Sequence, residues 1–429
     1  MGDWTRRRWI AAAAGISGLG GVEDMALAFD PAVPESRRPR SRMKISALRW
    51  TIVASPDEAL LASWRVHATH FKRTIVEVET ADGARGVGEI GDRDEDELRQ
   101  AREAVLGRDP FELERFRRTI RSLHVFGAVE TACLDLIGKV VNRRVVDLLG
   151  GPFREAARYS AYIFFVMPTP EGRDITTPEA AARLYAEFRK KYGFSSVKFK
   201  GGVLHPDKEI ETLRLMRAQH PDAKLRIDPN AGWSVETALR VAKAVEPLGL
   251  EYLEDPTPGL DGMAEVRRGT KIPLATNMVV TRMEHVAPAF QKGSVDVVLL
   301  DNHYMGGLTS CRHWAAICEA LGWGCSGHSN NHLGVSMAAM THMNCAISRV
   351  AYDADSHYPW TSEDVIKEPL RFKDGMIALP DAPGLGVEID RDRLARLAEN
   401  VARARSRNDL LEKWSPGYPN AKPGSRVRW

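Results

Sequence analysis

Short apolar strands alternate with helices over residues 158–379, and this alternation constrains the chain more than any other feature of its sequence. Candidate strands occupy residues 160–165, 196–200, 224–227, 252–253, 274–275, 295–300, 322–326 and 350–351. The segments between them have the spacing of amphipathic helices. Eight strands with intervening helices in about 220 residues predict an α/β fold of the (β/α) barrel type.

Polar residues recur at the ends of these strands. They are Lys200, Asp228, Glu254, Asn277, Asp301, His328 and His357, and 23 to 29 residues separate each from the next. That distance is one strand–helix unit. Barrel strands are parallel, so these side chains are expected at one rim, where barrel enzymes carry their active sites. No single residue is specific, but a series with the period of the fold predicts a catalytic site.

Asp228, Glu254 and Asn277 offer three oxygen ligands without sulfur or imidazole. Hard oxygen ligands, two of them anionic, suit Mg²⁺ with water or substrate completing the shell. Taken alone, each residue is more typical of a helix N-cap, because strand-to-helix loops often place Asp or Asn there. Their occurrence at successive strand ends favours the metal site.

Lys198 and Lys200 lie two apart in the strand 196–200 and share a face, opposite Val197 and Phe199. Two ammonium groups on one face indicate either a solvated edge strand or a closed site in which one amine acts as a base. A second ammonium and a divalent cation nearby both favour the neutral form of an amine. We therefore expect Lys200, nearer the mouth, to accept a proton and Lys198 to supply the neighbouring charge.

His328 is expected across the barrel, with Asp301 one strand earlier accepting a hydrogen bond from one of its ring nitrogens. The alternatives for His328 are a core histidine or half of a zinc pair with His332, and the zinc pair lacks the glutamate of the metalloprotease motif. Bases on opposite sides of a metal suit abstraction of a proton α to a carboxylate. The resulting enediolate needs a cation as charge develops, and the opposite group can return a proton or protonate a departing β-hydroxyl.

The first 42 residues have the pattern of a targeting segment and a linker. Residues 1–28 resemble a twin-arginine export signal, with paired arginines before the apolar run 11–22 and Ala26-Leu27-Ala28 as a cleavage site. The signal predicts a periplasmic protein, and the alternative is a basic tail on a cytoplasmic one. Residues 29–42, rich in proline and arginine, are expected to be a linker.

Residues 43–151 have the pattern of a compact α+β unit. Strands are expected at 45–54, 74–80 and 87–90, and helices at 94–106, 110–123 and 128–141. After residue 380 one further helix is expected, at 391–405. The net charge of +3 does not indicate a nucleic-acid or membrane partner. Five cysteines without a CxxC pattern do not predict a disulfide framework.

Five motifs together resemble the enolase superfamily, and most closely its glucarate dehydratase branch. They are Lys198-Phe-Lys200, Asp228-Pro-Asn230, Glu254-Asp-Pro256, Ala275-Thr-Asn277 and His328-Ser-Asn-Asn-His332, and the likeness extends over about residues 65–420. The resemblance implies a modified TIM barrel of the (β/α)₇β type at 152–380. It also implies that residues 43–151 form an N-terminal α+β capping domain and that 381–429 pack back on this cap.

The same resemblance implies roles for individual residues. Lys200 would be the base, Lys198 its electrostatic helper, and His328 with Asp301 the opposite acid/base pair. Implied substrate contacts are Asn230, Asn330, His357, Tyr162, His67 and Arg407. The expected reaction is the Mg²⁺-dependent loss of water from a small acid sugar to give a keto-deoxy acid, in a protein that forms a homo-oligomer.

Two departures from the branch concern the metal site and the cap. The segment that follows Glu254, residues 255–262, is shorter than in glucarate dehydratases and has Leu260 where a further glutamate is expected. The cap lacks a loop of the branch between Arg121 and Val125. The substrate therefore need not be glucarate. One alternative is a racemase or epimerase of hydroxy acids on the same scaffold. Another is an exported non-catalytic binding protein, which predicts lost ligands or bases, and none of the core residues is lost.

Overall fold

A computed structural model describes residues 43–63, 65–67, 70–168, 173–403 and 429. The predicted signal (1–28), the linker (29–42) and Arg407 lie outside the described residues. Met43–Trp429 form one unit, to which the following account applies. Among the described residues, no helix has the length and apolar character needed to cross a bilayer.

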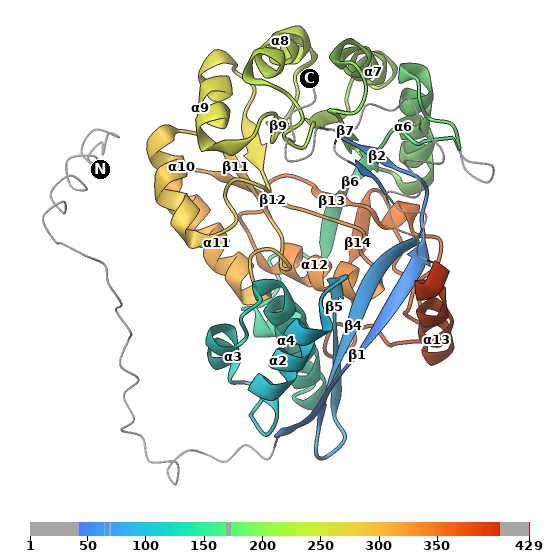
Figure 1. The fold of residues 1–429 in the computed structure, drawn as a ribbon, viewed down its shortest axis with the longest axis vertical. Helices are drawn as coiled ribbons and strands as arrows, with labels where there is room; N and C mark the ends of the chain where they lie inside the picture. Colours follow the sequence, from blue (N-terminus) through green and yellow to red (C-terminus); the bar gives the residue numbers. More distant parts are fainter. Residues whose placement is uncertain (1–42, 64, 68–69, 169–172, 404–428) are drawn as a thin grey trace, which may run out of the picture. The chain divides into compact units, whose positions relative to one another are not determined.

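Eight parallel strands form the central barrel (Figure 1). In chain order they are β6 (Ala156–Ile163), β7 (Ser196–Lys200), β8 (Lys224–Asp228), β9 (Tyr252–Glu254), β10 (Leu274–Thr276), β11 (Val297–Leu300), β12 (Gly324–Gly327) and β13 (Ala354–Ser356). The hydrogen-bonded order runs from β12 through β11 to β6 and then to β13. Between β12 and β13 the ring is joined by a bridge from Cys325 to Val350. The predicted modified TIM barrel is confirmed.

The eighth strand was predicted at the wrong place. Residues 350–351 were expected to form it, but Val350 makes only the isolated bridge and the strand is Ala354–Ser356. The reason is that Asp355 and Ser356 are fully buried polar residues. A search for apolar segments in the sequence misses a strand whose polar side chains point into the barrel.

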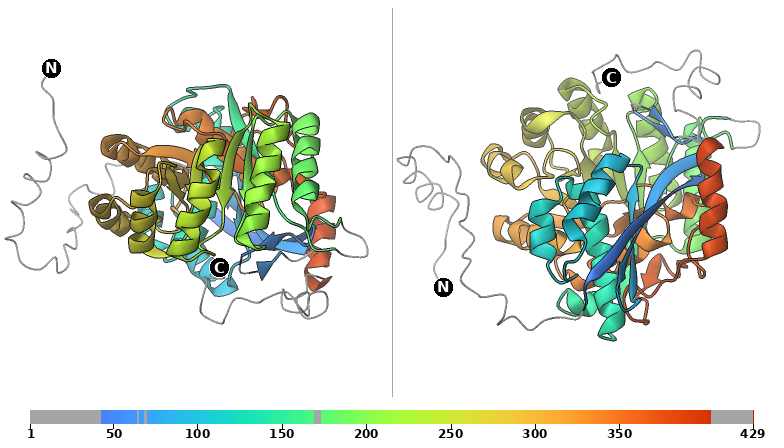
Figure 2. Two further views of the ribbon diagram at one scale, coloured as in Figure 1. Left: turned by 90° about the horizontal axis from the view of Figure 1, so that it is seen from above. Right: turned by 60° about the horizontal axis from the view of Figure 1, so that its bottom comes forward.

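Seven α-helices join the described strands, which matches the predicted (β/α)₇β order. They are α6 (Pro178–Tyr192), α7 (Pro206–Gln219), α8 (Val235–Val245), α9 (Gly259–Gly269), α10 (Val286–Lys292), α11 (Leu308–Leu321) and α12 (Gly334–Ala346). Their ends follow local chemistry. In α6, for example, Thr177 accepts from the Ala180 amide, and the helix ends at Gly193 with φ 78°. Figure 2 shows the helices outside the strands.

The cap contains an antiparallel sheet in the order β1 (Ile45–Pro56), β4 (His70–Thr80) and β5 (Arg85–Gly91). A short hairpin, β2 (Leu61–Ala62) with β3 (Arg65–Val66), and the helices α2 (Glu95–Val105), α3 (Leu113–Thr119), α4 (Leu123–Val140) and α5 (Val145–Leu148) complete it. α4 packs directly on β5. A Cβ on Gly88 would lie 2.0 Å from the Ala128 carbonyl oxygen, so glycine is required for this approach.

Beyond the barrel, β14 (Met376–Ala378) pairs antiparallel with β6, and α13 (Arg391–Glu399) lies beside β1 of the cap (Figures 1 and 2). Arg391 pairs with Glu77 on β4 at 2.5 Å. The helix expected at 391–405 is α-helical to Glu399 and then becomes a 3₁₀ turn. Trp429 contacts the barrel, where its N–H donates to the Gly232 carbonyl at 3.1 Å. All five cysteines are buried and unpaired, as expected.

The buried imidazole of His342 on α12 makes stability depend on pH. Its Nδ1 accepts from the Val146 amide and its Nε2 donates to the Leu385 carbonyl, both at 3.1 Å. Burial lowers the pKa of His342 to about 4. As the pH falls, the unfolded chain therefore takes up this proton before the folded chain does. This group stabilises the fold above about pH 6.5, and we expect it to cost about 3 kcal/mol by pH 4.

Urea titrations of the parent and of a His342→Gln variant at several pH values measure this contribution. The difference in free energy of unfolding between the two proteins should change between about pH 6.5 and 4. A difference that stays constant over that range contradicts the prediction.

Candidate active site

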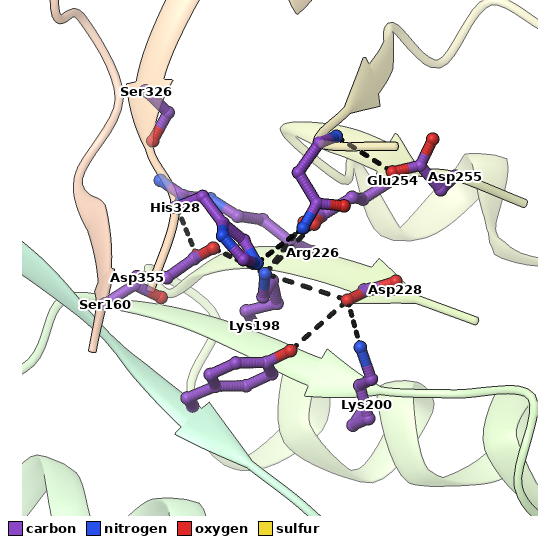
Figure 3. A network of polar contacts seen from close by, with 12 residues as sticks. Ser160, Lys198, Lys200, Arg226, Asp228, Glu254, Asp255, Ser326, His328 and Asp355 are labelled. Carbon is purple, nitrogen blue, oxygen red and sulfur yellow. Dashed lines mark hydrogen bonds and ion pairs between the residues drawn. The ribbon is translucent and has the colours of Figure 1, made fainter. Parts of the chain in front are cut away.

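The two lysines of β7 point into the barrel, and Lys198 is the deeper one (Figure 3). Its side chain is fully buried, and its Nζ lies 3.0 Å from Glu254 Oε2 and 2.5 Å from Asp355 Oδ2. Burial alone would lower the pKa of Lys198, but the charges of Asp355 and Glu254 raise it well above its usual range. Lys198 therefore remains a cation and fixes a positive charge at the floor of the site.

Asp355, which the sequence analysis did not select, completes this floor. It lies on β13 two residues before His357, so the alternation of the strand could have identified it. Beneath it, the fully buried guanidinium of Arg226 donates to the Asp353 carbonyl at 2.6 Å and pairs with Glu251 at 2.8 Å. These contacts keep the buried charges paired, as low-dielectric surroundings require.

Lys200 lies nearer the mouth, as predicted. Its Nζ donates to Asp228 Oδ2 at 2.5 Å, and the hydroxyl of Tyr162 donates to the same oxygen at 3.3 Å. Burial would raise the pKa of Asp228, but the charges of Lys200 and Lys198 hold it below its usual value. Asp228 is therefore an anion with two lysines beside it.

The three predicted metal ligands lie at the ends of neighbouring strands: Asp228 and Glu254 are the last residues of β8 and β9, and Asn277 follows β10. Burial and then the charge of Asp228 raise the pKa of Glu254 well above its usual range. The two neighbouring carboxyl groups, Asp228 and Glu254, therefore disfavour each other's ionisation. The Oδ1 of Asn277 is buried and has no hydrogen-bond partner among the described residues. Crowded carboxylates and an unsatisfied amide oxygen fit a hard divalent cation.

Asp255 is a further buried acid that the sequence analysis passed over. Its Oδ1 accepts from the Thr276 hydroxyl at 2.6 Å and its Oδ2 from the Asn277 amide N–H at 2.9 Å. Burial raises the pKa of Asp255 to about 7. Its backbone φ of 38° is unusual for a non-glycine residue. The residue thus anchors the end of β10 that presents Asn277, while Glu254 faces Lys198.

His328 and Asp301 form the predicted pair, with Nδ1 of His328 2.7 Å from Asp301 Oδ2. The amide of Asn277 donates to His328 Nε2 at 2.5 Å, so Nε2 carries the lone pair and Nδ1 carries the proton. Burial would raise the pKa of Asp301, but hydrogen bonds from His303 and His328 hold it well below its usual range. A carboxylate behind the imidazole stabilises the positive charge that His328 gains when it takes a proton.

His332 is a core histidine. It is fully buried next to His303, with ring centroids 5.1 Å apart, and neither ring nitrogen has a hydrogen-bond partner among the described residues. Burial holds the pKa of His332 well below its usual range. This environment gives no support to the zinc pair with His328.

One cavity of about 680 Å³ opens above these groups. Its walls bring together eight of the predicted residues: Lys200, Asn277, His328, Asn230, Asn330, His357, Tyr162 and His67. Asp228 and Asp301 lie behind this wall and contact it through hydrogen bonds with Lys200 and His328. Lys198 and Glu254 are not among the lining residues and are hydrogen-bonded to each other. Of the three predicted metal ligands, Asn277 lines the cavity together with the predicted base and substrate contacts, whereas Asp228 and Glu254 are not among the lining residues.

The cap contributes a wall that the sequence analysis did not foresee. Residues 121–124, where the cap is predicted to lack a loop of the branch, line the cavity together with Arg282 and Tyr304 of the barrel. Burial, and then the charge of Arg93, lower the pKa of His124 to about 4. Only packing of the cap on the barrel reveals this wall, because the residues are far apart in sequence.

Asp57 is another residue without a sequence signal. It is buried after β1, and its Oδ2 lies 3.1 Å from His357 Nε2 and accepts from the Asn331 amide at 2.8 Å. The ring of His67 stacks on that of His357 at a centroid distance of 5.7 Å. One ligand atom each from Asp57, His67 and His357 lies within 4.8 Å of the others. Two imidazoles make this group softer than the oxygen set that Mg²⁺ prefers.

Comparisons with known proteins agree with this geometry. A family described as "Enolase C-terminal domain-like" matches residues 180–393. The probable glucarate dehydratase of Streptomyces coelicolor is 43% identical over 393 residues, which cover 83% of this chain and 91% of that protein. The chain belongs to the enolase superfamily. Within the superfamily it falls in the glucarate dehydratase-like branch, and it is a lyase-type enzyme that acts on a small molecule.

Solved structures of the enolase superfamily share the fold over most of the chain. An enolase from Thermobispora bispora, complexed with magnesium and formate, has a TM-score of 0.85 at 38% identity and covers 90% of this chain and 100% of its own. An enolase from Mycobacterium smegmatis, complexed with tartrate, has a TM-score of 0.85 at 39% identity and covers 91% of this chain and 99% of its own. The predicted resemblance is thereby confirmed.

Replacing Lys198 with methionine tests the charge balance at the floor of the site. The Lys198→Met variant leaves Glu254 and Asp355 without their buried cation, and we expect the free energy of unfolding to fall by about 3–5 kcal/mol. Adding Asp355→Asn should recover part of this loss, because one buried charge is then removed. Denaturant titrations of the parent, the two single variants and the double variant measure the coupling. Additive losses would show that the pair is not coupled.

Proposed function

We propose that this protein is a Mg²⁺-dependent dehydratase of an acid sugar. It would remove the proton α to the substrate carboxylate, eliminate the β-hydroxyl and release a keto-deoxy sugar acid. The observation that carries the proposal is the placement of two bases in one cavity, Lys200 at the end of β7 and His328 after β12. In the sheet, the strands β8, β9 and β10, whose ends carry the oxygen ligands, lie between them.

The relatives support the substrate class and the cation. The Streptomyces coelicolor protein is named a probable glucarate dehydratase, and the Thermobispora bispora structure contains magnesium and formate. In this chain Asp228, Glu254 and Asn277 would hold Mg²⁺. When bound, the cation would stabilise the negative charge that develops on the substrate carboxylate as the α-proton leaves.

Lys200 is the proposed base. Lys200 lines the cavity, and its Nζ would take the α-proton from the substrate as a neutral amine. Lys198 stays charged beneath it and is held by Glu254 and Asp355. The Lys198 ammonium would thus provide a fixed positive charge near the substrate carboxylate, on which negative charge develops during the reaction.

His328 is the proposed acid. As an imidazolium, which the buried anion Asp301 stabilises, it would donate from Nε2 to the departing β-hydroxyl, which leaves as water. Once neutral, the same Nε2 would again accept the hydrogen bond from the Asn277 amide. Substrate hydroxyls would contact Asn230, Asn330, Tyr162, His67 and His357, and Arg407 stays a predicted contact. Export through residues 1–28 is part of the proposal.

The second candidate is a racemase or epimerase of a hydroxy acid. The observation that favours it is the same pair of bases, because a proton removed on one side can be returned on the other. Dehydration and epimerisation differ by the mass of one water, so mass spectrometry of the product from a panel of monoacid and diacid sugars separates them.

Two variants assign the proton transfers. Lys200→Ala should lose about 10²–10⁴-fold in kcat/KM, because the base is gone. His328→Asn should stop loss of water but leave exchange of the substrate α-proton with solvent deuterium, which Lys200 alone can catalyse. Lys190→Ala, an exposed lysine of α6, is the control and should match the parent. A Lys200→Ala variant as active as the parent contradicts the proposal.

Removal of the metal gives an independent check. Treatment with EDTA should abolish keto-acid formation, and added Mg²⁺ should restore it. An Asn277→Ala variant should need more Mg²⁺ for half-maximal activity, since one neutral ligand is lost while both carboxylates remain. Activity that EDTA leaves untouched would contradict the role of Asp228, Glu254 and Asn277.

A further inference from the structure

The two barrel helices that follow the loops of Asp301 and His328 begin without a capping side chain of their own. α11 follows Gly307 and α12 follows Leu333, and neither residue can accept a hydrogen bond with its side chain. The first N–H groups of a helix need partners, above all when they are buried. Both helices follow the loops that begin at Asp301 and His328. A group that accepts hydrogen bonds from the first turn of either helix therefore also fixes the C-terminal end of the loop before it.

A glutamate of the cap closes the start of α11. Glu130 on α4 is buried, and its Oε2 accepts from the amides of Leu308 at 2.5 Å and Thr309 at 3.4 Å. A Cβ on Gly307 would lie 2.1 Å from this oxygen, so only glycine permits the approach. The N–H of Gly307 donates to the Asn302 carbonyl at 2.7 Å, which closes the loop that begins at Asp301.

A second glutamate of the cap closes the start of α12. Glu89 on β5 accepts with Oε1 from the Leu333 amide at 2.9 Å and with Oε2 from the Ser336 amide at 2.8 Å. Arg73 on β4 pairs with Oε1 at 2.6 Å and donates to the Ser336 hydroxyl at 3.2 Å. Arg73 of the cap thus neutralises the charge of Glu89, while the carboxylate oxygens of Glu89 accept hydrogen bonds from the first turn of α12 in the barrel.

Hydrogen bonds connect these helix starts to the catalytic pair. Oδ1 of Asp301 accepts from the His303 amide at 2.7 Å, and His303 donates from Nε2 to the Glu89 carbonyl at 3.0 Å. The same nitrogen lies 3.1 Å from the Ser336 hydroxyl. Oδ2 of Asp301 then accepts from His328. A few hydrogen bonds therefore lead from the Glu89 backbone and from Ser336 of α12 to the imidazole, whereas Glu130 acts on Asp301 through the backbone of residues 301–309.

We propose that Glu130 and Glu89 are positioning residues for the Asp301–His328 pair. Each holds the start of the helix that follows one member of the pair, so the cap determines where Nε2 of His328 points. A misplacement of about 1 Å at a reacting group can cost 10²-fold in rate. The kinetic consequence rests on the proposed function, whereas the geometric consequence does not.

General stabilisation is the rival explanation, because any buried carboxylate that accepts backbone hydrogen bonds adds to stability. Asp135, on the same helix α4, provides a matched control. It is fully buried and accepts from the amides of Val87 at 2.9 Å and Leu385 at 2.8 Å. Neither amide belongs to the loops of the catalytic pair. Loss of Asp135 should therefore cost stability without disturbing His328.

The experiment compares the full-length parent with Glu130→Ala, Glu130→Gln and Asp135→Ala. Two readouts need no substrate: hydrogen–deuterium exchange of residues 301–309, and the imidazole ¹⁵N signals of His328, assigned by their loss in His328→Asn. Glu130→Ala should speed exchange about tenfold and shift the His328 signals. Glu130→Gln keeps an oxygen for both amides and should restore both readouts. Burial raises the pKa of Glu130 to about 7, which makes the neutral amide a mild replacement.

Kinetics complete the test. Glu130→Ala should lower kcat about 10²-fold, with KM changed less than about threefold, because binding contacts stay in place. Asp135→Ala should lower Tm to a similar extent while the His328 signals stay those of the parent. If Glu130→Ala does not fold, Glu130→Asp, which withdraws the oxygens but keeps the charge, is compared in the same way.

Two results would overturn the inference: His328 signals in Glu130→Ala that match the parent, or signals that Asp135→Ala shifts equally. A parent that dehydrates no acid sugar would instead contradict the proposed function. In that case the two substrate-free readouts still decide whether the cap positions the pair.

Discussion

Pairing of buried charges at the floor of the barrel is the constraint on which the rest of the site depends. Three cations meet three carboxylates there: Lys198, Lys200, Arg226, Asp228, Glu254 and Asp355. Buried charges are tolerated only when oppositely charged partners lie in fixed positions. The strands of a barrel provide such positions because each strand is hydrogen-bonded to a neighbour on both sides. The same pairing fixes the electrostatic field in the cavity above, so the protein's charged groups need to move little when charge develops during a reaction.

The periodic part of this arrangement could be predicted from sequence. β7 was predicted with its observed bounds, Ser196–Lys200, because its polar and apolar residues alternate and a helix stop precedes it. The alternation of strands and helices predicted the barrel, and the regular sequence separation of the polar strand ends predicted that their side chains meet at one rim. Lys200, Asn277 and His328 do line one cavity. Their chemical roles stay predictions, since geometry alone does not assign them.

The rest could not be predicted, for two physical reasons. β13 was misplaced because its inner face carries Asp355, and buried polar strands do not look apolar. Asp57, Glu89 and Glu130 were missed because their partners lie far away in sequence: Glu130, for example, contacts Leu308. A glutamate on a cap helix looks like any solvated charge until the packing of the cap on the barrel is known.

The gap between β12 and β13 gives the barrel a seam. The other neighbouring strands described here share ladders of backbone hydrogen bonds, whereas this pair is joined by one bridge and by side chains such as Ser326, which donates to the Asp353 carbonyl at 3.1 Å. His328 and His357 stand on opposite sides of the seam, and Asp57 reaches across its mouth to His357 and Asn331. His357, a proposed substrate contact, thus also takes part in barrel closure, so a substitution of His357 is expected to change how tightly the ring is held.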